Sequence, residues 1–348
     1  MVTRKEKSGY KEYILDGVPV RSMLEKGELV LLYLAGRSHQ GKGAIVDLGP
    51  LLGASTACLA QGALDGGHED SVIDSFDLWH INNYEGFLKD LNCSPAGSLL
   101  GGFNNRMQNH LTRVRPHQGD FLDWQWGDAP IEILFVDLSK TWSLENHLMK
   151  TMMPKLIPGG LLIHQDYIHH NEYWIHINME RYRDHFTHLG FVYGATSWYR
   201  CEKPIPAGEM LSEDLSYKEK MDLLTSARSR AAPSVKEVMK TAAAKCAIEN
   251  GDVETAQALI DSVSYEVLGE EPLHHFQGIA KTGVAVVQAM IDSYEAPPKR
   301  RAFLKNGNFS SRLPLLFCGY SDILLCFSAV KLITERTRGF YFACASLA

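Results

Sequence analysis

A glycine-containing segment near residue 50 has the residue types of an anion-binding turn. In IVDLGPLLGASTACLA, an apolar run leads in order to Asp47, Gly49, Gly53, Ser55 and Thr56. Glycine lets a backbone turn sharply and approach a ligand closely. A helix that begins after such a turn presents free N–H groups and positive partial charge. The pattern therefore predicts a strand, a loop and a helix that bind a phosphate or a carboxylate group.

Two other phosphate-binding patterns are absent from this loop. A dinucleotide fingerprint needs G-x-G-x-x-G, whereas no glycine lies between Gly49 and Gly53. A P-loop needs glycine and lysine directly before serine or threonine, and the loop contains no lysine. The missing patterns argue against a P-loop enzyme and make a nicotinamide oxidoreductase the less favoured alternative.

Polar side chains also follow two later apolar runs. The run EILFVDL carries Asp137 at its end, and the run PKLIPGGLLIHQDY places His164, Gln165 and Asp166 after a proline-glycine turn and an apolar stretch. In open α/β sheets, ligands bind at the edge formed by the carboxyl ends of the strands. We therefore expect these side chains to lie at a ligand-binding edge.

Histidine is unusually dense beyond the second of these runs. Six of the 14 histidines fall within residues 164–188. An imidazole titrates near neutral pH and can act as the general base for a hydroxyl substrate. His164 ends the apolar run and His169 lies on the loop after it, so both are candidates for this base. No HExxH-type spacing supports a zinc site.

Together, these segments resemble the class I S-adenosylmethionine-dependent methyltransferases. The D-x-G-x-x-x-G-x-S-T pattern is similar to motif I of that family. The P-K-L-x-P-G-G-x-L-I-x-x-D-Y run resembles the macrocin-type O-methyltransferases, a branch that methylates hydroxyls of sugars and natural products. The resemblance covers about residues 40–203. It implies a Rossmann-like fold, S-adenosyl-L-methionine as the cofactor and a small acceptor with a hydroxyl group.

The resemblance also implies a set of cofactor-binding residues. They are Asp47, Gly49, Gly53, Ser55, Thr56, Asp74 and Asp120. The family has an acid after the second strand that accepts both ribose hydroxyls. In SVIDSFDLW the D-S-F pattern favours Asp74 over Asp77 for this role. Asp120, in HQGDFLD, would be the polar residue near the adenine.

In the macrocin-type branch, three acids after the fourth and fifth strands hold a divalent cation. Asp137 and Asp166 match two of these positions, but Gln165 stands at the third, and Lys140 adds a positive charge nearby. An amide oxygen can ligate Mg²⁺, although it contributes no charge. The sequence therefore leaves dependence on Mg²⁺ open. The expected catalytic residues are Asp137, His164, Asp166 and His169.

Alternating strands and helices must position these residues. Apolar runs predict strands at 44–48, 71–76, 113–117, 131–136 and 160–164, and amphipathic stretches predict helices at 55–64, 103–111 and 143–156. This alternation predicts an α/β fold with a doubly wound, mostly parallel sheet. Two β-rich runs within residues 190–201 predict an antiparallel hairpin at its end.

Composition changes divide the chain into four expected parts. These are an N-terminal helical extension at 1–39, an S-adenosylmethionine-binding methyltransferase domain at 40–206, a helical domain at 207–300, and a C-terminal tail at 301–348. Within the third part, VKEVMKTAAAKCAIENGDVETAQALIDSV predicts two helices joined at a turn that Asp252 caps. The loop at 78–106, rich in aromatic residues, is expected either to cover a ligand or to pack on the core.

The composition excludes several other classes of protein. The 348 residues carry 35 Lys and Arg against 41 Asp and Glu, and the seven cysteines are scattered without a CxxC pair. These values argue against a disulfide scaffold, a structural zinc site and a nucleic-acid surface. The charged N-terminus lacks a signal-like apolar core. The apolar stretch at 313–333 contains charges that disfavour a membrane span. We expect a cytoplasmic protein, with a homo-oligomer left open.

The expected function is methyl transfer from S-adenosyl-L-methionine to a hydroxyl on a sugar or another small natural product. The alternative of a different class is a non-catalytic methyltransferase-like scaffold that binds a protein partner through its helical region. Gln165 in place of an acid slightly favours the scaffold. The intact glycine loop argues against it, because a scaffold has no need for a cofactor loop.

Overall fold

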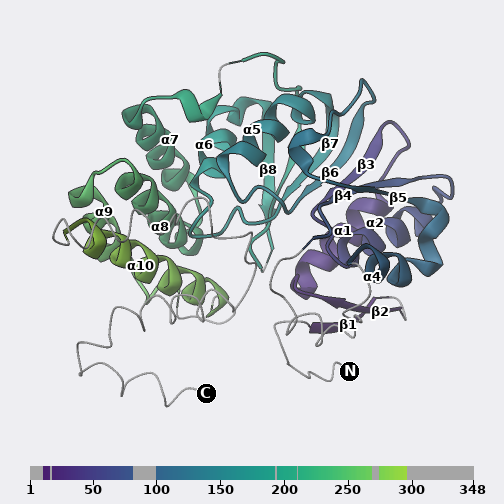
Figure 1. Ribbon diagram of the computed structural model, residues 1–348, viewed down its shortest axis with the longest axis horizontal. Coiled ribbons are helices and arrows are strands. Elements are labelled where there is room, and N and C mark those ends of the chain that lie inside the picture. Colours follow the sequence, from purple (N-terminus) through teal and green to yellow (C-terminus); the bar gives the residue numbers. More distant parts are fainter. Residues whose placement is uncertain are drawn as a thin grey trace. The chain divides into compact units, whose positions relative to one another are not determined.

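One mixed sheet of seven strands lies at the centre of the computed structural model (Figure 1). The structure describes residues 11–15, 18–80, 99–192, 194–209, 211–268 and 274–295. In chain order the strands are β3 (Ala44–Leu48), β4 (Ile73–Asp77), β5 (Val114–Gln118), β6 (Ile131–Val136), β7 (Leu156–His164), β8 (Phe186–Phe191) and β9 (Ser197–Cys201). Their spatial order is β5-β4-β3-β6-β7-β9-β8.

The strand directions confirm the predicted topology. Strands β5, β4, β3, β6 and β7 are parallel, whereas β9 pairs antiparallel with both β7 and β8. The parallel part places the carboxyl ends of β3, β4, β6 and β7 at one edge, which is where the sequence puts its candidate site residues. We refer to this edge as the rim.

Alternate residues of the central strands face different helical layers. Ile45, Ile133 and Ile163 pack with helices α1 (Lys26–Arg37) and α2 (Ala54–Asp65). Val46 and Leu134 pack on the other side with α5 (Trp142–Thr151) and α6 (Tyr173–Arg181). Fully burying one such side chain contributes about 1.5–3 kcal/mol. The two-residue period of the strands therefore gives each layer its own apolar core and produces the doubly wound fold.

The remaining described elements near the sheet are a hairpin, a short helix and several 3₁₀ turns. They are the β1–β2 pair (Lys11–Leu15 and Val18–Ser22), helix α4 (Leu99–Arg106), and the 3₁₀ turns η1 (Gln108–Arg113), η2 (Phe121–Asp123), η3 (Met153–Lys155), η4 (Arg183–His185) and η5 (Ser212–Asp214). The sequence did not predict the β1–β2 hairpin within its N-terminal helical extension. The helix predicted at 143–156 ends at Thr151, and the 3₁₀ turn η3 that follows contains Pro154.

Four further helices follow the sheet, namely α7 (Tyr217–Arg230), α8 (Pro233–Glu249), α9 (Val253–Asp261) and α10 (His274–Glu295). Helices α7 and α8 pack against α6, while α9 and α10 pack against α8. The predicted turn between α8 and α9 is confirmed, because Asp252 Oδ1 accepts a hydrogen bond from Thr255 N at 3.0 Å. The Tyr173 hydroxyl on α6 donates to Glu249 on α8 at 2.6 Å. The sheet and these helices belong to one compact unit.

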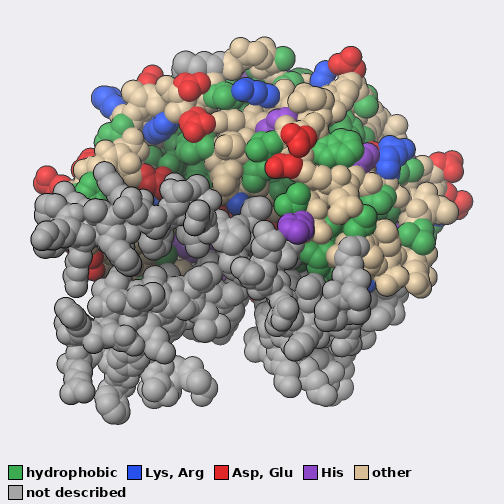
Figure 2. Space-filling view, viewed as in Figure 1, with side chains coloured by type: hydrophobic (Ala, Val, Ile, Leu, Met, Phe, Trp, Pro, Cys, Tyr) green, Lys and Arg blue, Asp and Glu red, His purple; other side chains and the backbone are tan. Residues whose placement is uncertain are grey.

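Several of the predicted segments lie outside the described residues. These include the predicted tail at 301–348, the apolar stretch at 313–333 and most of the aromatic loop. Among the helices that the structure describes, none combines the length and the apolar character needed to cross a bilayer. On the face seen in Figure 2, the basic side chains are interspersed with acidic, polar and apolar ones.

Candidate functional site

The loop after β3 has a backbone that only glycine can adopt at two points. Gly49 has φ +87°, and a Cβ there would lie 2.5 Å from the carbonyl oxygen of Asp137. Gly53 has φ +88° at the N-cap of α2, where a Cβ would lie 2.7 Å from Met107 Cε. The Gly49 N–H donates to Phe76 O at 2.9 Å and joins the loop to β4. Both predicted glycines thus form a close-fitting turn at the rim.

The polar side chains of the same motif bond to one another. Asp47 is fully buried, and its Oδ2 accepts hydrogen bonds from Ser55 Oγ at 2.8 Å and Thr56 Oγ1 at 2.5 Å. The two hydroxyl protons therefore tie the start of α2 to β3 and are not available to a ligand. Ser55 and Thr56 shape the loop in this structure, although the resemblance implied that they contact the cofactor.

Burial makes Asp47 an unusual acid. Desolvation raises its pKa to about 7, although the hydrogen bonds from Thr56 and Ser55 lower it, and the charges of Asp137 and Asp77 raise it further. Its other oxygen, Oδ1, is buried without a hydrogen-bond partner among the described residues. An unsatisfied buried acceptor of this kind needs a partner that the structure does not include. It fits a donor group on a ligand seated at the loop.

Of the two acids in β4, Asp77 and not Asp74 lies at the rim. Asp77 ends the strand, and its carboxylate accepts Leu51 N of the glycine loop at 2.9 Å and Trp79 N at 2.7 Å. Asp74 is the second residue of β4, and its Oδ1 accepts Arg115 Nη1 at 2.9 Å and His117 Nε2 at 2.7 Å. The preference for Asp74 is therefore corrected on geometry.

The reason for this correction is strand periodicity. Residues three apart on a strand point to opposite faces. Asp77 shares its face with Ser75, whose hydroxyl lies 3.2 Å from Thr56 Oγ1 on α2. Asp74 shares its face with Phe76, which packs in the core on the α5 side. Burial raises the pKa of Asp77, although its two backbone hydrogen bonds oppose the shift.

Asp120 lies beside the end of β4. The preceding Gly119 N–H donates to Asp77 O at 3.1 Å. The exposed Asp120 side chain accepts Leu122 N at 3.0 Å and caps the 3₁₀ turn η2. The structure thus brings Asp120, Asp77 and the glycine loop together at the rim.

The three side chains predicted to bind a metal converge on Lys140. Its Nζ donates to Asp137 Oδ1 at 2.9 Å, to Gln165 Oε1 at 3.5 Å, and to Asp166 Oδ2. These three residues also stand at the ends of β6 and β7, where Asp137 N donates to Leu48 O and Gln165 N donates to Val136 O. Asp166 adopts φ +64°, a conformation that few non-glycine residues take.

This arrangement does not fit a bound Mg²⁺ ion. An ammonium group already lies between the oxygens that would ligate the metal, and a divalent cation beside it would meet strong repulsion. In the part of the chain that the structure describes, no group of three His, Cys, Asp or Glu side chains has a geometry suited to a metal. We therefore derive no chemical step through a metal.

The two candidate bases have different surroundings. His164 is 1% exposed on the α5 face of β7, and its Nε2 lies 3.6 Å from Glu145 Oε2. Its imidazole thus faces Glu145 on helix α5. His169 lies on the loop after β7, keeps 13% of its side chain exposed, and bonds through Nδ1 to Glu172. The placement therefore favours His169 over His164 as the base.

Glu172 is a site residue that the sequence analysis did not single out. Burial acts to raise its pKa, but the charges of His169, Lys140 and Lys245 outweigh burial and hold the pKa below its usual range. Glu172 is thus an ionised partner that fixes the His169 ring. Glu172 stands at the start of α6, three residues after His169, and this spacing is the one local signal that could have indicated its role.

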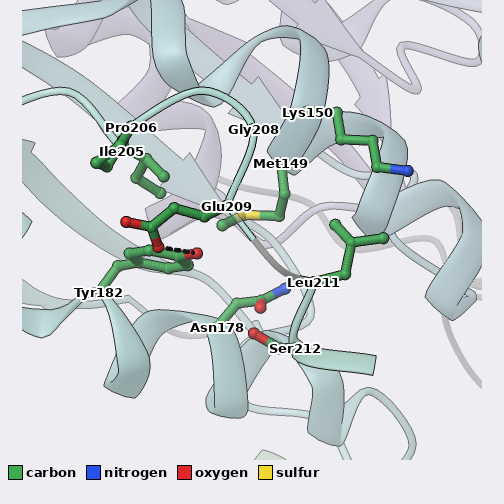
Figure 3. Close-up of a pocket in the computed structure, with 10 residues that line it drawn as sticks. All are labelled: Met149, Lys150, Asn178, Tyr182, Ile205, Pro206, Gly208, Glu209, Leu211 and Ser212. Atoms are coloured by element: carbon green, nitrogen blue, oxygen red, sulfur yellow. Dashed lines mark hydrogen bonds between the residues drawn. The ribbon is translucent and has the colours of Figure 1, made fainter. Parts of the chain in front are cut away.

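Two cavities lie at the opposite edge of the sheet from the rim. One, of about 20 Å³, is formed by the C-terminal ends of α5 and α6 and by residues 205, 206, 208, 209, 211 and 212, and in it the Tyr182 hydroxyl donates to Glu209 at 2.9 Å (Figure 3). It has room for about one water molecule. The other, of about 430 Å³, is lined by residues that precede β3 and β4. Neither contains any of the predicted site residues.

The sequence of the rim matches a known family. Residues 46–167 match the family model described as a methyltransferase domain. This segment includes the glycine loop, Asp77, Asp120 and the Lys140 cluster, so the rim lies within the matched part. No protein with a curated description matches the chain.

Solved structures with a similar arrangement include three methyltransferases. The O-methyltransferase NovP has 16% identity and a TM-score of 0.42, and the match covers 52% of this chain and 82% of NovP. The calicheamicin methyltransferase CalS11 has 16% identity, a TM-score of 0.34, and coverage of 49% and 76%. The Podospora anserina methyltransferase PaMTH1, solved with SAH bound, has 12% identity, a TM-score of 0.31, and coverage of 52% and 89%.

Proposed function

We propose that this chain transfers a methyl group from S-adenosyl-L-methionine to a hydroxyl on a sugar or another small natural product. The observation that carries the proposal is the rim, where a glycine turn packs on the backbone of Asp137 and is held by Asp77. The methyltransferase-domain match across the same residues supports it.

The proposed cofactor contacts follow from the positions of these groups. Asp77 accepts the two ribose hydroxyls, since a carboxylate has lone pairs beyond those used by Leu51 N and Trp79 N. Asp120 accepts from the adenine amine. The unpaired Oδ1 of Asp47 and the N-terminus of α2 face the amino-acid end of the cofactor. In this assignment, Gly49 and Gly53 act through the backbone.

The methyl transfer itself needs positioning and the removal of one proton. When bound, S-adenosyl-L-methionine would supply an electrophilic methyl group, and its transfer to the acceptor oxygen would leave the bonding electron pair on sulfur as neutral S-adenosylhomocysteine. Glu172 holds the Nδ1 side of His169, so that Nε2 takes the hydroxyl proton. The products are the methyl ether, S-adenosylhomocysteine and a protonated His169.

A labelled-methyl assay tests this proposal. The full chain is incubated with methyl-labelled S-adenosyl-L-methionine and a panel of glycosides and phenolic natural products, and transfer to an acceptor hydroxyl is expected. For the acceptor found, H169Q should lower kcat by about 10²–10⁴-fold, because proton transfer is worth that much. E172Q should lower kcat by a smaller factor, since it only loosens the ring.

The matched control is His188→Gln on the outer strand β8, which should leave kcat unchanged. S-adenosylhomocysteine affinity should stay the same in all three variants, because none of the three residues contacts the cofactor in this assignment. Transfer to no acceptor by a chain that binds S-adenosylhomocysteine, or a kcat unaffected by H169Q, would contradict the assignment.

A further inference from the structure

The Lys140 cluster lies at the meeting point of two strand ends. Its side chain contacts Asp137 after β6 and both Gln165 and Asp166 after β7. The Lys140 side chain is 22% exposed, and the carboxylates of Asp137 and Asp166 are 17% and 6% exposed. A lysine ammonium has three N–H donors, so one group can serve all three oxygens. The ammonium thus has the position and the ligand set of a bound cation.

The loop that carries Lys140 is fixed on both sides. Lys140 N donates to Leu138 O at 2.7 Å in a tight turn, and Ser139 O accepts the indole N–H of Trp174 at 2.8 Å. Thr141 then caps α5 by accepting Leu144 N at 3.3 Å. The ammonium is therefore held in place by the backbone as well as by its ionic partners.

The charges of the cluster explain why Gln165 and Lys140 occur together. Three acids around a divalent cation would carry a net charge of about −1 (three negative charges against two positive). Two acids, one amide and one ammonium also carry about −1 (two negative charges against one positive). Replacing the metal by lysine alone would leave the site more negative. The amide at position 165 compensates for this difference.

We propose that the Lys140 ammonium replaces a divalent cation at this rim and makes the site independent of metal. It holds Asp137 and Asp166 at a fixed separation and provides a positive charge beside the His169–Glu172 pair, on which its charge already acts. Lys140 is in this respect a positioning residue. The role of Lys140 in methyl transfer rests on the proposed function. Its role as an internal cation is independent of that function.

Manganese binding by the full chain tests the proposal without any assay of activity. Binding of Mn²⁺ is followed by electron paramagnetic resonance for the wild-type chain and for K140Q. The wild type should bind no Mn²⁺ through Asp166. K140Q, which removes the charge and keeps two carboxylates, should bind Mn²⁺ at least tenfold more tightly than the wild type. Adding Q165E to K140Q should tighten binding again, and adding D166N should abolish it.

The control is K140R, which keeps the positive charge and should gain no Mn²⁺ binding. Wild-type Mn²⁺ binding that D166N removes would overturn the proposal, and so would a folded K140Q that gains none. If K140Q does not fold, the wild-type and D166N measurements still decide between the two outcomes. Because no cofactor is present in this experiment, its result is separate from that of the methyl-transfer assay.

Discussion

The rim has two halves, and each satisfies its polar groups differently. In the glycine-loop half, burial raises the pKa of Asp47 although two hydroxyls donate to it, and the backbone supplies the shape. In the other half, Asp137 and Asp166 both form ion pairs with one lysine. The difference shows that polar residues of a binding motif need not face the ligand. In the first half they hold the loop, and the proposed cofactor contacts therefore fall to Asp77 and to backbone N–H groups.

The largest expected effect concerns the pH dependence of stability in the glycine-loop half. The folded pKa of Asp47 is about 7 and its ordinary value is 3.8, so the folded chain binds a proton more tightly than the unfolded chain. Stability should therefore fall as the pH rises from about 4 to 7. D47N has no carboxyl group at this position to titrate, so it does not lose stability in this way. The unfolding free energy of D47N minus that of the wild type should therefore rise by up to roughly 4 kcal/mol over the same pH window.

Urea unfolding of both chains at several pH values measures this difference. Other shifted groups, such as Glu28, contribute equally to both chains and cancel. A difference that does not change with pH would mean that Asp47 is ionised at no cost in the folded chain. The contrast between the halves would then disappear.

The next effect separates the shape of the loop from simple backbone strain. G49A forces a positive φ on alanine and places its Cβ 2.5 Å from Asp137 O, so we expect a loss of about 3 kcal/mol in stability. G67A has nearly the same φ, +85°, but its Cβ would meet no atom within 4 Å. It should cost only about 1 kcal/mol.

Chemical denaturation of the two variants gives the comparison. An equal loss of stability in both variants would show that the loop does not closely approach the backbone that follows β6. The described contact between the two halves would then be contradicted. Because G49A displaces the turn, it should also abolish S-adenosylhomocysteine binding, which G67A should preserve.

The sequence predicted much of the sheet and only part of the site. Short apolar runs identify β3 and β6 with the bounds seen in the structure, because a buried parallel strand must be apolar on both faces. The sequence did not indicate that Asp77 and not Asp74 lies at the rim, since the strand period and the pairing with β3 decide which acid reaches it. Local spacing does not contain that information.

The role of Lys140 was also beyond local sequence. Lys140 and Asp166 are far apart along the chain, and they meet only because β6 and β7 are neighbours in the sheet. The same holds for the burial of His164, which depends on the face of β7 that packs against α5. Sequence patterns thus give the elements and the edge, whereas tertiary packing decides which side chains face a ligand.

The smallest of these effects tests the central claim most directly, that a cofactor binds at the rim beside Asp77. S-adenosylhomocysteine is titrated calorimetrically into the wild-type chain, D77N and D74N, with circular dichroism to verify folding. The wild type should bind, with and without Mg²⁺ alike. D77N should bind about 10–100-fold more weakly, from the loss of charged hydrogen bonds, while D74N stays close to the wild type. No binding by the wild type, or a loss in folded D74N that D77N does not show, would contradict the account.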